Sequence, residues 1–182
     1  DAETHDHIRK VKGSFHKTMQ GLDNLDEFSN ITLLTNTVIT ALSYQQLPQI
    51  VKRLSHLNNL AQMDFWTYWP MSEEDDKDLI VSHLDVLPHL KEAIKLCELY
   101  DRAIDLKNYP ECLLGDKHGV LSNGQPKLMI DEDFWSEFSR NGFHQCIYKD
   151  RCTSRECLGL NTAYVRKFGW MEHDLKPYLP TI

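Results

Sequence analysis

The chain has 182 residues, of which 41% are hydrophobic and 26% charged, a composition typical of a soluble globular protein. Its formal net charge of −7 disfavours non-specific binding to nucleic acid or to an anionic membrane. No apolar run approaches the ~20 residues that span a bilayer, and residues 1–15 lack the apolar centre of a secretory signal. These features predict a cytoplasmic protein without nucleic-acid or membrane partners.

The beginning of the chain has an unusual pattern. It has no initiator Met, and its first residues resemble the end of one element running into a loop. We therefore expect a fragment of a longer protein, or a protein that lacks its beginning. His5 and His7 lie in this loop-like stretch, where solvated polar side chains are the simplest interpretation.

Helical and strand patterns alternate from the start of the chain. Apolar residues within 14–25 follow one helical stripe, and the β-branched run at 31–40 predicts a buried strand. A helix with one apolar face is predicted over 43–57. Residues 62–71 then predict a strand that ends at a proline.

The alternation continues with a helix over 85–100 and a short strand over 102–106. Strands that alternate with helices imply a parallel sheet with helices outside it. Functional groups of such a sheet gather at the carboxy-terminal ends of its strands.

The pattern changes after residue 110. Asn123-Gly124 lies between two apolar runs in residues 119–130, which is a strong signal for a β-hairpin. Acidic residues from Asp131 favour the start of a helix. A cysteine-bearing segment then leads into a last helix, which Gly169 can end.

This second part carries four of the five cysteines: Cys112, Cys146, Cys152 and Cys157. An odd number of cysteines without a signal peptide argues against a disulfide framework. Thiolates suit soft metals, and four of them fit either Zn²⁺ or an iron–sulfur cluster. Structural zinc sites commonly use tight CxxC pairs, which this chain lacks, so the wider spacing favours a cluster. The alternative is that these are ordinary buried or loop cysteines.

Basic residues lie between the cysteines of this predicted metal site. Lys149, Arg151 and Arg155 interleave with the thiols, where they could lower thiolate pKa values and offset the charge of a ligated cluster. Cys97 differs, because it lies on the apolar face of a predicted helix, which indicates a buried structural thiol.

Several segments together resemble the radical S-adenosylmethionine (radical SAM) enzymes. HDHIRKVKGSFHKTMQGLDNL resembles the loop and helix after the fourth strand of their (β/α) barrel. The order LLTNTVIT, SYQQLPQIVKRLSHL, MDFWTYWPM resembles the fifth strand, the fifth helix and the sixth strand. PECLLGD, a hairpin and then C…C…CLGLNTAYVRKFG resembles the auxiliary-cluster extensions called SPASM and twitch domains, with the last segment the most specific.

The resemblance implies an α/β fold of two parts. Residues 1–110 would form the carboxy-terminal part of a radical SAM (β/α) barrel, and residues 111–182 a small α+β cysteine-rich extension. Four cysteines suit a single 4Fe-4S cluster in a twitch-like module, held by Cys112, Cys146, Cys152 and Cys157. The CxxxCxxC motif that holds the catalytic cluster of these enzymes is absent. The first half of the barrel is therefore expected to lie outside this chain, or to come from another chain.

The same resemblance suggests residues that contact S-adenosylmethionine. Asp1 would lie near the ribose and methionine parts of the cofactor. Asn36, Thr37 and Thr40 would face the cofactor or the substrate, and Trp69 and Pro70 would contact adenine.

The function implied by the resemblance is radical modification of a substrate, either a peptide or a small molecule. The intact enzyme would use S-adenosylmethionine, a second 4Fe-4S cluster and an external electron donor. This chain, which lacks the catalytic motif, is expected to be inactive alone. The alternative is a non-catalytic binding module that zinc or a cluster stabilises.

Overall fold

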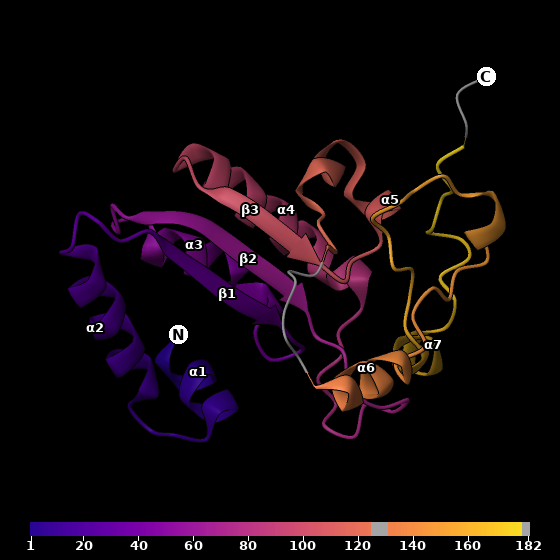
Figure 1. The fold of residues 1–182 in the computed structure, drawn as a ribbon, viewed down its shortest axis with the longest axis horizontal. Helices are drawn as coiled ribbons and strands as arrows, with labels where there is room; N and C mark the ends of the chain where they lie inside the picture. Colours follow the sequence, from indigo (N-terminus) through magenta and orange to yellow (C-terminus); the bar gives the residue numbers. More distant parts are fainter. Residues whose placement is uncertain (125–130, 180–182) are drawn as a thin grey trace.

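A sheet of three parallel strands forms the centre of the computed structural model, which describes residues 1–124 and 131–179. The strands are β1 (Leu33–Ile39), β2 (Leu60–Thr67) and β3 (Ala103–Lys107), in the order β1-β2-β3 (Figure 1). Both neighbouring pairs run parallel. The parallel arrangement predicted from the sequence is therefore confirmed.

Two helices connect these strands and cover one face of the sheet (Figure 1). They are α3 (Leu47–Leu54) and α4 (His83–Leu99). Pro48 occupies the first turn of α3, where its missing N–H would have no helical partner. The side chain of Ser82 accepts a hydrogen bond from the N–H of Leu84 and so caps α4.

The main hydrophobic core lies between α3, α4 and this face of the sheet. Alternate strand residues point to the same side, and a register irregularity near the start of β2 places both Leu60 and Met63 in the core. The fully buried members include Ile39, Leu47, Leu60, Met63, Phe65, Leu90, Ile94 and Leu106.

The opposite face of the sheet is polar. Asp64 of β2 pairs in register with Asn36 of β1 and with Asp105 of β3, which places three polar side chains in a row. On the same face, Leu34 and Val38 of β1 remain 57% and 45% exposed. The described part of the chain forms no second hydrophobic core on this face.

A second, smaller core surrounds α7 (Thr162–Phe168) in the carboxy-terminal part. Its buried members are Ile80, Leu160, Ala163, Tyr164 and Leu175. Ile80 comes from the first part of the chain, and Leu114 and Leu121 of the second part belong to the main core. The two cores therefore meet near the predicted division at residue 110 and share residues across it.

The remaining helices flank these two cores. They are α1 (Ala2–Arg9), α2 (Ser14–Asp26), α5 (Glu111–Leu114), α6 (Glu132–Ser139) and short 3₁₀ helices at Tyr44–Gln46, Gly115–Val120 and Lys149–Arg151. None of the helices in the described ranges is long and apolar enough to cross a membrane.

Two local expectations are corrected. The stretch around His5 and His7 is the helix α1 rather than a loop, since Asp1 accepts a hydrogen bond from the N–H of Thr4 and caps it. In the first arm of the expected hairpin, residues 119 and 120 belong to a 3₁₀ helix rather than a strand, and Leu121 forms an isolated parallel bridge with Leu106. The second arm, residues 125–130, lies outside the described residues.

The sheet is open at β1 and β3, and the described residues do not close a barrel. Membership of a larger radical SAM barrel remains a prediction. It would require further strands at one or both edges of this sheet.

Candidate metal centre

Four cysteines from separate segments converge beside the second core. Cys112 lies in the short helix α5, and Cys146 follows the isolated bridge between Gln145 and Leu160. Cys152 ends the 3₁₀ helix at Lys149–Arg151, and Cys157 precedes the bridge residue Leu160 by a short loop. All four are partly buried free thiols.

The thiols lie within electrostatic reach of one another. Burial is the main reason that the pKa of Cys112 is raised, and the charges of Cys157, Cys146 and Cys152 raise it further. Burial likewise raises the pKa of Cys157, with a contribution from Cys146. Four thiolates at such proximity repel one another, so a cation or a cationic metal cluster among them would stabilise the ionised forms.

Each of the four sulfurs accepts a hydrogen bond from a backbone N–H. The N–H of Tyr148 donates to Cys146 over 3.4 Å, and that of Gly159 donates to Cys157 over 3.3 Å. The N–H of Tyr178 donates to Cys152 over 3.4 Å. The remaining donors are the N–H of Lys176 to Cys112 and that of Glu111, also to Cys157. Backbone donors of this kind favour the thiolate form and tune a ligated cluster.

The carboxy-terminal tail fastens this arrangement. The carbonyl of Tyr178 accepts a hydrogen bond from the N–H of Thr153 over 2.8 Å, and the Tyr178 hydroxyl donates to the carbonyl of Glu111 over 3.4 Å. The Glu111 carboxylate accepts a hydrogen bond from the Ser154 hydroxyl. The tail therefore joins the segments that carry Cys112, Cys152 and Cys157.

The arrangement is not that of a preformed single-ion site. Among the described residues, no three His, Cys, Asp or Glu side chains are grouped so that they could hold a metal ion. The four thiols are thus near one another without forming a compact coordination sphere.

The basic residues predicted to accompany the thiols are on the surface. Lys149, Arg151 and Arg155 are all exposed, and the guanidinium of Arg151 lies 4.8 Å from the ring centroid of Tyr148. Cys97 is fully buried in the main core, with its sulfur 3.8 Å from that of Met63. Burial raises the pKa of Cys97 to about 12, which confirms the predicted structural role.

The residues predicted to contact S-adenosylmethionine are dispersed. Asp1 caps α1, and its terminal ammonium donates to Gln46 over 2.6 Å. Asn36 and Thr37 are adjacent in β1 and therefore point to opposite faces of the sheet. Only Asn36 lies on the polar face, so the two side chains cannot line one ligand pocket.

The other three residues have packing roles. The buried hydroxyl of Thr40 shares a hydrogen bond of 3.0 Å with that of Ser43 in the turn after β1. Trp69 packs edge-on against Phe138 and Phe143, and Pro70 is buried. These contacts show ordinary packing, and the proposed contacts with the cofactor remain a prediction.

Aromatic residues that the sequence did not single out as functional pack beside the cysteines. Tyr164 packs beside the cysteines in the second core and stacks on His83, while the hydroxyl of Tyr109 donates to the carbonyl of His83 over 2.5 Å. The apolar spacing of α7 indicated a buried Tyr164, but its partner 81 residues earlier has no sequence signal.

Comparisons with protein families, with curated proteins and with solved structures find no match to this chain.

Proposed function

We propose that residues 111–182 hold one 4Fe-4S cluster on Cys112, Cys146, Cys152 and Cys157. The observation that carries this proposal is the convergence of four partly buried thiols, each of which accepts a hydrogen bond from a backbone N–H group. A cluster bound there would store or relay one electron at a time. With all four positions ligated by protein, it would have no open iron for a substrate.

The chain's own residues have defined roles in this proposal. The N–H groups of Tyr148, Gly159, Tyr178 and Lys176 stabilise negative charge on the sulfurs, which favours the ligating thiolates. The second core excludes water from one side of the thiols. The tail around Tyr178 holds segments that are distant in sequence at fixed separations.

We further propose that the chain is the carboxy-terminal part of a radical SAM enzyme that modifies a peptide or a small molecule. The parallel strands with helices on one face support this proposal, because a (β/α) barrel is built from parallel strands with its helices outside them. The intact enzyme would also need the missing catalytic cluster, S-adenosylmethionine and an electron donor.

The metal proposal is tested by anaerobic purification, a visible spectrum, and iron and zinc analysis. Iron is expected, on the order of four atoms per chain, together with visible absorbance from the cluster. Zinc in place of iron would support the alternative of a zinc-stabilised binding module. If the protein contains neither iron nor zinc, both the cluster proposal and the zinc alternative are overturned.

The enzyme proposal is tested with S-adenosylmethionine and dithionite under anaerobic conditions. The reconstituted chain alone is expected to release no 5′-deoxyadenosine above a cluster-free control, because it lacks the CxxxCxxC motif. Release would mean that the division into a missing catalytic half and a present auxiliary half is wrong.

A further inference from the structure

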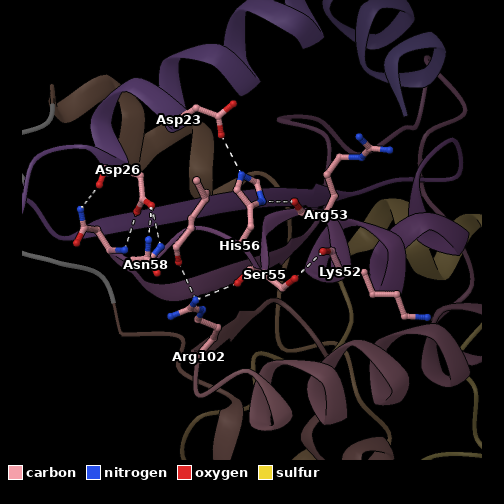
Figure 2. A network of polar contacts seen from close by, with 10 residues as sticks. Asp23, Asp26, Lys52, Arg53, Ser55, His56, Asn58 and Arg102 are labelled. Atoms are coloured by element: carbon pink, nitrogen blue, oxygen red, sulfur yellow. Dashed lines mark hydrogen bonds and ion pairs between the residues drawn. The ribbon is translucent and has the colours of Figure 1, made fainter.

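A hollow of about 660 Å³ lies between α2 and α3, away from the cysteines. We call it the α2–α3 hollow. Its lining combines apolar side chains of α2 with polar side chains of α3 and the residues after it. These residues are Phe15, His16, Met19, Asp23, Gln49, Lys52, Arg53 and His56. Figure 2 shows Asp23 and His56 facing each other from the two helical segments.

His56 lies between two hydrogen-bond acceptors, and its contact with Asp23 is the main reason that the pKa of its imidazole is raised. Its Nδ1 lies 2.9 Å from the carbonyl oxygen of Arg53, and its Nε2 lies 2.9 Å from a carboxylate oxygen of Asp23 (Figure 2). Both oxygens only accept hydrogen bonds, so the two bonds form together only when both ring nitrogens carry a proton. In that form the imidazolium and the Asp23 carboxylate neutralise each other.

The remaining cations of the hollow are weakly neutralised. The guanidinium of Arg53 lies 5.7 Å from the ring centroid of Phe15, and no carboxylate in the described part of the chain lies within ion-pair distance of it. Lys52 has Glu92 as its partner, but at 3.8 Å, with both side chains about half-exposed. An exposed ion pair of this kind contributes little free energy, so Glu92 neutralises Lys52 only weakly.

We propose that the α2–α3 hollow binds a phosphate monoester, with the phosphate at Arg53 and Lys52 and its organic part against Phe15 and Met19. A guanidinium presents a planar fork of donors that matches phosphate oxygens, and an ammonium adds a point charge. The hydrogen bond from His56 engages the Asp23 carboxylate and, when the ring carries both protons, offsets the repulsion between this carboxylate and an anion.

The simplest competing explanation is the helix dipole. Cations in the last turn of a helix are stabilised by its partial negative charge, and Lys52 and Arg53 lie in the last turn of α3. This accounts for basic residues at that position. It does not account for a guanidinium that reaches the aromatic ring of a different helix.

The test is titration of the full 182-residue chain with adenosine 5′-monophosphate, followed by calorimetry or amide NMR at low ionic strength. Saturable binding is expected, with shifts centred on α2 and α3. Loss of one charge-assisted contact in Arg53→Gln should weaken binding about tenfold. Lys52→Gln should weaken it less, because its ammonium is partly engaged by Glu92.

The matched control is Lys95→Gln, which removes the same charge from an exposed position on α4. It should leave the dissociation constant unchanged. An equal loss in Lys95→Gln would identify general charge attraction and overturn the proposal. So would the absence of saturable binding, or affinity for inorganic phosphate equal to that for the nucleotide, since the apolar wall would then have no role. These outcomes do not depend on iron, so they are separate from the fate of the cluster proposal.

Discussion

The ring of Tyr164 lies flat on the ring of His83, with centroids 4.2 Å apart and planes 11° from parallel. The Tyr164 hydroxyl also accepts a hydrogen bond from the backbone N–H of His83 over 2.9 Å. His83 begins α4, and Tyr164 belongs to α7 in the second core. This contact joins α4, which packs on the sheet, to the part of the chain that carries the cysteines.

Replacement of Tyr164 by Phe should keep the stacking and remove the hydroxyl. The buried N–H of His83 would then lose its acceptor, and the free energy of unfolding should fall by about 1–3 kcal/mol. Urea denaturation measures this change. Tyr148→Phe is the matched control, because its hydroxyl donates to the carbonyl of Glu172 at an exposed position and should matter less. Equal effects would show that the buried hydrogen bond has no special weight.

Stability should fall as the pH is lowered, because His83 is buried in its neutral form. Burial lowers the pKa of His83 to about 3, against about 6.5 in an unfolded chain. Between these values the unfolded chain binds a proton that the folded chain does not. His83 therefore contributes a loss of up to about 1.4 kcal/mol per pH unit as the pH falls through this window.

The variant His83→Phe isolates this effect, because phenylalanine can stack on Tyr164 without titrating. The free energy of unfolding, measured by urea denaturation at several pH values, should depend less on pH for His83→Phe between about pH 6.5 and the acid limit of folding. If the free energy of unfolding depends on pH equally in His83→Phe and the unaltered chain, His83 is not the cause of the pH dependence.

Lys167 of α7 should stabilise the fold more than its neighbour Arg166. Its ammonium lies 2.9 Å from a carboxylate oxygen of Asp75, whose side chain is only 5% exposed, and 2.8 Å from the carbonyl of Ile80. Lys167→Met would leave that carboxylate buried without its cation, at a cost on the order of 1–3 kcal/mol. Arg166 pairs with the exposed Glu73 and Glu74, and Arg166→Met should cost less than about 1 kcal/mol. Urea denaturation of the two variants distinguishes them, and the reverse order would contradict this account.

Gly142 should not tolerate a side chain. Its φ is +57°, and a Cβ would collide with the Thr162 hydroxyl at the start of α7. Gly142→Ala should therefore lower the free energy of unfolding by about 1–3 kcal/mol. Gly21→Ala in α2 is the control, since nothing lies within 4 Å of the added Cβ and the change should stabilise the helix by roughly 0.5–1 kcal/mol. Thermal melting of both variants provides the comparison, and a stable Gly142→Ala would contradict it.

The alternation of strands and helices was predictable because each element has its own hydrophobic period. The strands at 31–39, 62–69 and 102–106 are parallel as expected. Helix α1 was missed because it is short and buries none of its residues. Its stability depends instead on two aspartates. Asp1 caps the helix, and the carboxylate of Asp6 accepts hydrogen bonds from the N–H groups of Gly13 and Phe15.

The hairpin predicted from Asn123-Gly124 is not tested, because its second arm lies outside the described residues. The Asn123 side chain accepts a hydrogen bond from the N–H of Asn108 and donates one to the carbonyl of Glu156, so it joins segments that are distant in sequence. The sequence predicts one coordination sphere for the four cysteines; in the structure their thiols influence one another electrostatically, but the described residues form no compact group of metal ligands. The donors from Lys176 and Tyr178 could not be foreseen, because a backbone N–H carries no signature of its residue.

The central claim is that Cys112 completes one cluster with Cys146, Cys152 and Cys157. It is tested most directly by anaerobic reconstitution with iron and sulfide, followed by quantification of both per chain. The unaltered chain and Cys97→Ser should each bind about four iron and four sulfide. Cys112→Ser should bind less iron, or lose it faster to a chelator. Equal iron retention in Cys112→Ser and Cys97→Ser, or no iron in any of the three proteins, would contradict the four-cysteine cluster.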